Sequence, residues 1–251
     1  MYDELNKKVA LITGASRGFG RAIALRLAKE GCEVIINYRR SKTEAEDVLR
    51  EVAQLGGSGI AIRADVGNPD KVMAMMDTIK EEYGRVDILV ANASFGIPGK
   101  IMDATAKYWE VTMNSSARSL LMLSQLCEPM MRGWGRIVVV TSYGGQRVLP
   151  GYGVVGPAKS AVEGLMRAIA IELAPKGILV NGVMPGISDT KSLRAIPDVE
   201  DVLERAKNLC PTKELVTGDQ VSNVVAFLCS DQAEMICGQF IIVDGGSYII
   251  G

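Results

Sequence analysis

Short runs rich in valine and isoleucine alternate with longer amphipathic stretches along the chain, and this alternation limits the possible folds more than any other feature. The apolar runs lack a regular polar alternation, which is typical of strands buried on both faces. Strands joined by helices pair in parallel through right-handed crossovers, so helices cover both faces of one sheet. The predicted strands are Val9–Thr13, Glu33–Asn37, Gly59–Arg63, Val86–Ala91, Arg136–Thr141, Ile178–Val183 and Phe240–Val243.

The amphipathic stretches between these runs predict helices. Gly31 follows the first and Gly56 the second as stop signals, and Pro69 suits the start of the third. No linker or repeat divides the 251 residues, so we expect one α/β domain over residues 1–251 with a doubly wound, parallel, seven-stranded sheet. The predicted helices are Arg21–Glu30, Thr43–Leu55, Pro69–Tyr83, Lys107–Met131, Ala158–Leu173 and Asp219–Cys229.

The composition excludes several classes of function. The chain has no histidine, so Ser-His-Asp and Cys-His catalysis and histidine-ligated metals are excluded. A net charge of −1 gives no basic field for nucleic acid. The five cysteines are widely spaced without a CxxC pair, which predicts reduced thiols and no metal site. There is no signal peptide and no membrane-spanning run, so we expect a cytoplasmic enzyme.

A glycine-rich segment directly follows the first predicted strand and precedes a predicted helix. Gly14, Gly18 and Gly20 have the spacing GxxxGxG. Glycine lets the backbone approach a pyrophosphate closely, and the N-terminus of the helix supplies N–H donors and the positive end of its dipole. In this setting the segment predicts a dinucleotide site, and the alternative is merely a tight turn.

The end of the second strand indicates which dinucleotide binds. An NAD site needs an acid there to accept the ribose hydroxyls, but the chain has no acid at this point before Glu44. Arg17, Arg39 and Arg40 are placed to surround a 2′-phosphate, a dianion that guanidinium groups bind well. We therefore expect NADPH, with a solvated basic turn as the alternative, and the sequence does not indicate which arginine makes the contact.

Together these motifs resemble the short-chain dehydrogenase/reductase family over essentially the whole chain. The resemblance implies a Rossmann-type fold, an adenine contact at the end of the third strand, an Asn-Ala turn after the fourth and a Pro-Gly turn after the sixth. Ser94 stands where the family usually has a glycine. The predicted cofactor-binding residues are Gly14, Ser16, Arg17, Gly18, Phe19, Gly20, Arg39, Arg40, Asp65, Val66, Asn92, Ala93, Lys159, Pro185, Gly186 and Thr190.

The catalytic segment departs from the common family pattern, which has tyrosine four residues before lysine. Val155 occupies that position and cannot donate a proton, whereas Tyr152 stands seven residues before Lys159. On a helix, seven residues rise about 10.5 Å and four about 6 Å, so we expect the phenol one turn further from the lysine. By resemblance, Tyr152 is the proton donor or enolate stabiliser, and Lys159 binds the ribose hydroxyls and lowers the tyrosine pKa.

This displacement has a chemical interpretation. Ketone reduction places hydride on the carbon that bears the oxygen, whereas conjugate reduction of an enoyl thioester places it two carbons away. The acid must then sit at least ~2.5 Å further from the nicotinamide. The spacing resembles that of the NADPH-dependent type III enoyl-acyl-carrier-protein reductases. It implies hydride transfer to the β carbon of an enoyl thioester on acyl-carrier protein or coenzyme A. A reductase of β-ketoacyl thioesters or secondary-metabolite ketones, and a non-catalytic NADPH-binding protein, remain alternatives.

Two further side chains near the fifth strand are site candidates. Ser142 stands where the family places its substrate-polarising serine, and the alternative is a cap of the strand end. Tyr143 is a predicted substrate contact, and the alternative is ordinary packing. The register of the family's active-site asparagine falls on Ser116, and Asn114 lies about 200° around the helix from it.

The remaining predictions concern a loop and a helix. The irregular segment at about 185–211 follows the sixth strand, so we expect a substrate lid, with a surface insertion as the alternative. The apolar side of the long helix within residues 107–131 is expected to form core or a subunit interface. Family members are usually tetramers or dimers through such helices, which implies a homotetramer or homodimer.

Overall fold

The computed structural model describes residues 2–191, 193–195 and 198–250, and at its centre is a parallel sheet of seven strands. The strand order is β3-β2-β1-β4-β5-β6-β7. The sheet grows outward in both directions from the β1–β4 pair, which confirms the predicted doubly wound arrangement. The strands are β1 (Val9–Ile12), β2 (Glu33–Tyr38), β3 (Ser58–Arg63), β4 (Ile88–Ala91), β5 (Gly135–Val140), β6 (Ile178–Pro185) and β7 (Phe240–Val243).

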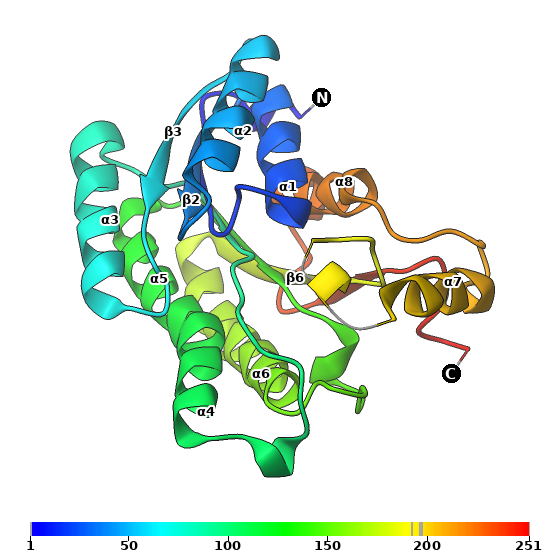
Figure 1. Ribbon diagram of the computed structural model, residues 1–251. Helices are drawn as coiled ribbons and strands as arrows, with labels where there is room; N and C mark the ends of the chain where they lie inside the picture. Colours follow the sequence, from blue (N-terminus) through cyan, green and yellow to red (C-terminus); the bar gives the residue numbers. More distant parts are fainter. Residues whose placement is uncertain (1, 192, 196–197, 251) are drawn as a thin grey trace.

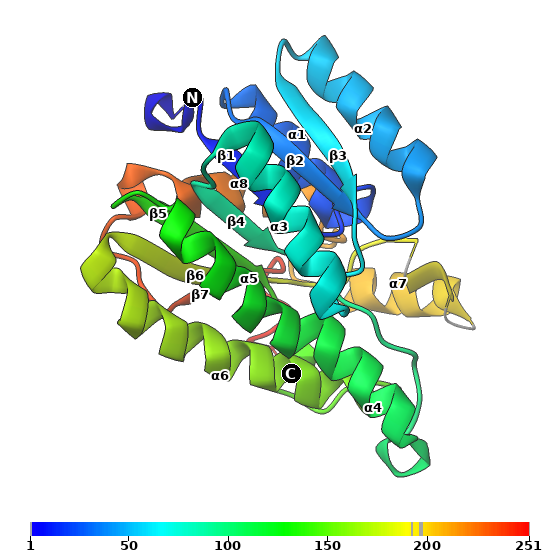
Figure 2. The same ribbon diagram turned by 90° about the vertical axis from the view of Figure 1, so that its left-hand side faces the viewer.

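Helices cover both faces of this sheet (Figure 1). Figure 2 shows α3, α4, α5 and α6 in front of the strands, while α1, α2 and α8 lie behind them. The helices are α1 (Gly18–Lys29), α2 (Lys42–Gln54), α3 (Pro69–Tyr83), α4 (Ala106–Met113), α5 (Ser119–Cys127), α6 (Val155–Leu173), α7 (Val199–Leu209) and α8 (Gly218–Cys229).

The hydrophobic core has two halves, one on each face of the sheet. Successive side chains of a strand point to opposite faces, so each strand contributes to both halves. Ala10 and Ile12 of β1 pack in the half that includes residues of α1, α2 and α8. Val9 and Leu11 pack in the half that includes residues of α3, α5 and α6. The apolar runs of the sequence are therefore buried on both faces, as predicted.

The long helix predicted around Lys107–Met131 is confirmed as one continuous helical run, which consists of α4, a π-helical turn at Asn114–Arg118, α5 and a short 3-10 turn at its end. Serine hydroxyls at the π-helical turn bond to the backbone: Ser115 Oγ donates to Thr112 O at 3.3 Å, and Ser119 Oγ donates to Ser116 O at 2.9 Å. Such bonds compete with the regular helical ladder. A π-turn is also a frequent feature of functional sites.

The start of α6 changes the geometry expected for the catalytic segment. The helix begins at Val155, earlier than predicted, and Pro157 lies in its first turn, where no backbone N–H is needed. Tyr152 precedes the helix and forms an isolated bridge with Gly99. Tyr152 therefore lies outside the helix, so the rise per residue of a helix does not measure its separation from Lys159.

After β6 the chain leaves the sheet for the 185–211 segment. The acidic stretch within this segment forms α7, which projects from the body of the molecule (Figure 1). Leu203 is buried on α7, while Leu209 is exposed. All five cysteines are free thiols, as predicted. Within the described ranges, no helix combines the length and the apolar character needed to cross a membrane.

A buried carboxylate joins β1 to the start of β4, which generates a first prediction. Asp87 Oδ2 accepts a hydrogen bond from Val9 N at 2.8 Å, and Asp87 also pairs with Arg85. We expect Asp87→Ala to lower the free energy of unfolding by about 2–4 kcal/mol, because a buried N–H and a cation lose their partner. Urea unfolding measures this. The control Asp47→Ala, which removes a surface pair with Arg50, should change it by less than about 0.5 kcal/mol. Equal small effects of both substitutions would contradict the prediction.

Candidate active site

The carboxyl ends of the parallel strands meet at one edge of the sheet. In open α/β sheets, ligands bind at this edge where the strand order reverses, which here is between β1 and β4. The glycine loop follows β1, the Asn-Ala turn follows β4, Ser142 follows β5, and the 185–211 segment follows β6. The fold therefore gathers most of the predicted site residues on one edge.

The glycine loop has the backbone shape that a pyrophosphate site requires. Gly14 and Gly18 have φ angles of +63° and +57°, in the left-handed region that favours glycine. At Gly20 a Cβ would come within 2.5 Å of Gly14 O and 2.6 Å of Asn92 Nδ2, so a side chain is excluded there. The loop opens onto the N-terminus of α1, which offers backbone donors to an anion. These residues fit a dinucleotide.

Thr13 fixes the loop against the turn after β4, a role that the sequence did not indicate. Its Oγ1 accepts hydrogen bonds from Asn92 N and Ala93 N, both at 3.0 Å. In return, Asn92 Nδ2 donates to Thr13 O at 2.8 Å and to Gly14 O at 3.2 Å. The predicted Asn92-Ala93 turn and the glycine loop are therefore parts of one hydrogen-bonded unit.

Asn37 is a second residue that sequence reasoning missed. It is buried at the end of β2, where its Oδ1 accepts from Gly14 N at 3.3 Å and its Nδ2 donates to Ala64 O at 3.0 Å. A polar residue at the end of an otherwise apolar strand was the available signal. Asn37 ties the glycine loop to the end of β3, so three strands hold the loop in place.

The three arginines predicted to bind a 2′-phosphate have different surroundings. Arg39 is half-buried, with Nη1 3.6 Å from Asp65 Oδ2 and its guanidinium 4.9 Å from the centroid of the Phe95 ring. Arg17 and Arg40 are exposed. Arg39 is therefore already oriented, and its charge is partly balanced by Asp65, the residue predicted to contact adenine.

A groove of about 250 Å³ lies between the start of α1, the 185–211 segment and the start of α8. It brings Gly18, Phe19 and Thr190 together, as expected of three predicted cofactor residues. Thr190 Oγ1 also accepts a hydrogen bond from Leu193 N at 3.3 Å. The other lining residues are Arg21, Ala22, Ser188, Asp189, Thr217, Gly218 and Asp219.

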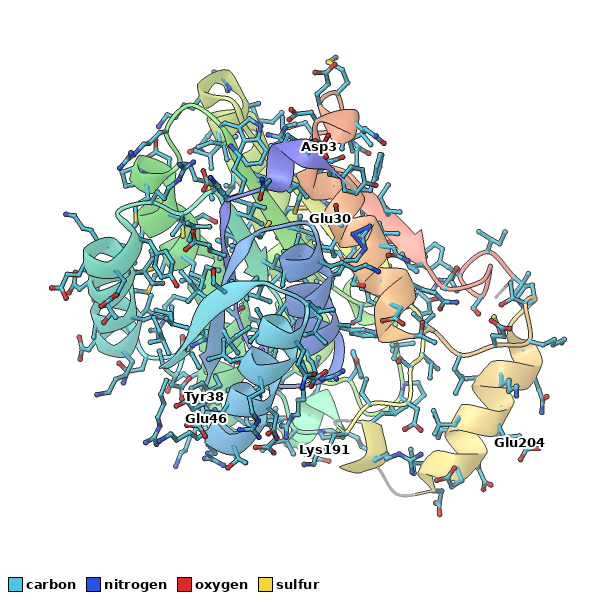
Figure 3. All side chains as sticks on the ribbon, turned by 90° about the horizontal axis from the view of Figure 1, so that it is seen from above. Asp3, Glu30, Tyr38, Glu46, Lys191 and Glu204 are labelled. Atoms are coloured by element: carbon cyan, nitrogen blue, oxygen red, sulfur yellow. The ribbon has the colours of Figure 1, made fainter. Side chains whose placement is uncertain are left out.

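The 185–211 segment is attached to the body of the molecule at two points. Near its start, Lys191 Nζ lies 3.7 Å from Glu44 Oε1 of α2, and Figure 3 shows Lys191 at the same edge of the molecule as Glu46. After α7, Cys210 Sγ donates to Asp244 O at 3.4 Å. The segment thus extends from β6 along the site edge to α2 and returns to the turn after β7.

Lys159 is buried at the end of β5, where its Nζ donates to Val140 O at 3.0 Å. Burial lowers the pKa of Lys159 to about 8, and the Glu163 carboxylate opposes this shift. A small cavity of about 10 Å³ lies beside it and is also lined by Ser116 and Thr13. Ser116 of the π-helical turn therefore lines the same cavity as Lys159.

Tyr152 packs against the turn that follows Ser142. A Cβ on Gly144 would come within 2.3 Å of Tyr152 Cδ1, so the tyrosine ring lies directly on the glycine backbone. Ser142 Oγ is buried and has no hydrogen-bond partner among the described residues. A buried hydroxyl without a partner is rare, and this one is available to a bound carbonyl oxygen. The Val155 side chain lies against Gly96 of the loop after β4, where a Cβ would come within 2.2 Å of Val155 Cγ2.

The Tyr143 hydroxyl donates to Asp244 Oδ2 at 2.5 Å. Burial and this carboxylate raise the pKa of Tyr143 well above its ordinary value. The phenol proton of Tyr143 is thus held in the hydrogen bond to Asp244. The Tyr143 ring packs at a tilt on the Tyr248 ring, with the two centroids 5.5 Å apart. Tyr143 is therefore unsuited to acid catalysis. That Tyr143 contacts the substrate stays a prediction, and such a contact would be made by its ring.

Comparison with known proteins bears on this arrangement. Residues 14–248 match the family described as Enoyl-(Acyl carrier protein) reductase. A 1-cyclohexenylcarbonyl-CoA reductase from Streptomyces collinus is 36% identical over 250 residues, which cover 97% of this chain and 88% of the relative. The chain belongs to the short-chain dehydrogenase/reductase family. As a family member with a formed dinucleotide loop, it is an NAD(P)-dependent reductase.

Other members of the short-chain dehydrogenase/reductase family differ in the reactions that their names state. The 3-oxoacyl-(acyl-carrier-protein) reductase FabG from Staphylococcus epidermidis is 37% identical over 244 residues, covering 96% of this chain and 99% of that protein. A short-chain dehydrogenase from Burkholderia cenocepacia, solved in complex with NADP, is 34% identical with a TM-score of 0.89, covering 97% of this chain and 99% of its own. The reductase class is therefore shared, while both enoyl and keto substrates occur among the relatives.

The packing of Gly20 generates a second prediction. We expect Gly20→Ala to weaken NADPH binding at least tenfold, about 1.4 kcal/mol, because the new methyl group must displace Gly14 or Asn92. Titration of NADPH fluorescence measures this. The control Gly164→Ala adds a methyl group to exposed α6, where it meets no atom within 4 Å, and should leave binding unchanged. Similar affinities of the two variants would contradict the proposed place of the pyrophosphate.

Proposed function

We propose that this short-chain dehydrogenase/reductase reduces an α,β-unsaturated acyl thioester with NADPH. The observation that carries the proposal is the position of Tyr152, in the turn before α6, with Val155 where the common pattern has its tyrosine. The description of the matching family and the name of the Streptomyces relative, whose substrate is an unsaturated thioester, support the enoyl reaction.

NADPH is the proposed cofactor because the end of β2 carries arginines where an NAD site needs an acid. Arg39 would hold the 2′-phosphate together with Arg17 or Arg40, and the glycine loop would hold the pyrophosphate. By the family resemblance, Lys159 would bind the nicotinamide ribose. When bound, the cofactor supplies the hydride that reaches the β carbon of the substrate.

The protein's own part in the reaction is to stabilise charge on the thioester oxygen. As the β carbon accepts hydride, the electron pair of the double bond moves toward the carbonyl and leaves an enolate. The Tyr152 hydroxyl would hydrogen-bond to that oxygen, and the buried hydroxyl of Ser142 would supply a second donor. A proton taken up at the α carbon completes the reduction.

Ketone reduction is the second candidate function, and the identity of 37% to a 3-oxoacyl reductase favours it. In that reaction, Tyr152 would protonate the oxygen on the carbon that receives the hydride. The two reactions thus demand different distances between the tyrosine hydroxyl and the nicotinamide.

The remaining parts of the proposal concern the substrate and the assembly. We propose that the 185–211 segment is a lid, since it borders the groove and is attached at Glu44 and Asp244. The thioester carrier would be acyl-carrier protein or coenzyme A. The apolar side of the long helix, with Leu120 and Leu123, packs in the core. Association into a dimer or tetramer stays a prediction, as does the cytoplasmic location.

A substrate comparison gives the third prediction. With NADPH and purified protein, we expect crotonyl thioesters to be reduced and acetoacetyl thioesters to be reduced at least tenfold more slowly, about 1.4 kcal/mol in the barrier. NADPH absorbance follows the rate, and chromatography of the acyl product identifies the reaction. Oxidation of NADPH with the keto substrate alone would end the enoyl proposal.

The fourth prediction concerns Tyr152. We expect Tyr152→Phe to lower kcat by about 10²–10⁴-fold while leaving NADPH affinity within a few-fold, because only the proton donor is removed. The control Tyr83→Phe removes a hydroxyl on α3, remote in the chain from the site edge, and should retain full activity. A non-catalytic binding protein would show no turnover before or after the change, and full activity of Tyr152→Phe would overturn the role of Tyr152.

A further inference from the structure

Glu163 is a buried acid that the mechanism so far does not use. It stands four residues after Lys159 on α6, so both side chains lie on the same face of the helix, and its side chain is 3% exposed. Acids are almost never buried to this extent unless they are paired. Its location next to the reacting groups calls for a function.

Both carboxylate oxygens of Glu163 bind the segment that carries Ser142 and Tyr143. Thr141 Oγ1 donates to Glu163 Oε1 at 2.8 Å, and Gln146 Nε2 donates to Oε2 at 3.0 Å. At Gly145 a Cβ would come within 2.3 Å of Oε1, so the absence of a side chain there lets the turn lie on the carboxylate. Glu163 thus holds both ends of the turn that contains Ser142 and packs on Tyr152.

The network continues outward from Gln146. The Tyr248 hydroxyl donates to Gln146 Oε1 at 2.7 Å, and the Arg147 guanidinium lies 3.9 Å from the centroid of the Tyr248 ring. Gln146 itself is exposed, whereas Glu163 is buried. The negative charge of the network therefore lies at its inner end, close to Lys159.

Lys159 receives little other electrostatic support. The Val140 carbonyl accepts its hydrogen bond, and the carboxylate of Glu163 is the charged group that raises its pKa against the effect of burial. The Lys159 cavity lies between the ends of β1, β4 and β5, the π-helical turn, α5 and α6, and the described residues that line it besides Lys159 have apolar or hydroxyl side chains. They are Thr13, Ala91, Ala93, Ser116, Ser119, Leu120, Val139, Val140 and Val162.

We propose that Glu163 is a positioning residue that fixes the Ser142 turn on α6 and keeps the Lys159 ammonium charged. The proposal rests on the proposed reductase function for its effect on rate, but its effect on Lys159 exists in the protein without substrate. Hydrogen bonding and charge are two separate contributions of the same carboxylate. They predict different results for two variants.

The single variant Glu163→Gln removes the negative charge. The double variant Gln146→Glu with Glu163→Gln, called the exchange, also removes the charge from position 163 but restores the hydrogen bonds. In the exchange, the amide at 163 still accepts from Thr141 and donates to the carboxylate at 146, while the charge moves outward to an exposed position. The exchange keeps the net charge of the protein and the hydrogen bonds that hold the turn. It therefore shows the effect of the negative charge at position 163 even where the single variant Glu163→Gln is unstable. Glu172→Gln, on an exposed position of α6, is the matched control.

The direct readout is the pKa of Lys159 in the protein without substrate. Carbon-13 labelled lysine is titrated by NMR, and the Lys159 signal is assigned by its loss in Lys159→Arg. We expect the Lys159 pKa to fall by about one unit in both Glu163→Gln and the exchange, because an opposite charge close by is lost. The control should titrate like the wild type. Thermal stability should fall in Glu163→Gln and recover in the exchange.

The pH dependence of kcat is a second readout, and it should shift to lower pH just as the Lys159 pKa does. Since the ammonium form of Lys159 is required, a lower pKa moves the alkaline limb of the kcat profile to lower pH, so activity is lost near pH 8 and retained near pH 6. An unchanged Lys159 pKa in the exchange, or a uniform loss of rate at every pH, would overturn the proposal. If the wild type reduced neither thioester, the proposed function would fail, whereas the NMR titration would still decide the role of Glu163.

Discussion

The hydrogen bond from the buried Lys159 ammonium to the Val140 carbonyl is the interaction on which the site depends. It joins the start of α6 to the end of β5, which are the two elements that carry Tyr152 and Ser142 at their borders. A buried ammonium is stable only where its charge is balanced and its protons have acceptors. The carbonyl and Glu163 meet these requirements, and the surrounding hydroxyl groups keep the pocket polar.

The rest of the site edge of the sheet depends on two glycines that let neighbouring groups pack directly on the backbone. Gly20 allows the glycine loop to lie on Asn92, and Gly144 allows Tyr152 to lie on the turn after Ser142. Tyr152 therefore lies on a turn and not on a helical face. This position separates the phenol from the place that Val155 occupies, which the common family pattern gives to its tyrosine.

The sheet was predictable because each strand is a short apolar run whose burial on both faces leaves a clear signal, as in β1 and β5. The glycine loop was predictable for a different reason, because its glycine spacing follows from the backbone geometry of a dinucleotide site. The π-helical turn was not, because serine side chains compete with the helix only once they meet carbonyls in space. Likewise, Thr13 and Glu163 carry no local motif, and the polar character of Asn37 at the end of its strand does not reveal which groups it binds. Their partners lie on distant segments, so their roles became visible only in three dimensions.

The central claim is that Tyr152 acts on the thioester carbonyl oxygen, whose carbon lies two positions from the β carbon that receives hydride. A crystal structure of the protein with NADPH and a crotonyl thioester measures this most directly. The account predicts the Tyr152 hydroxyl within about 3.2 Å of the thioester oxygen, with the β carbon over the nicotinamide ring. It would be contradicted by a productive complex in which that oxygen lies out of reach of Tyr152.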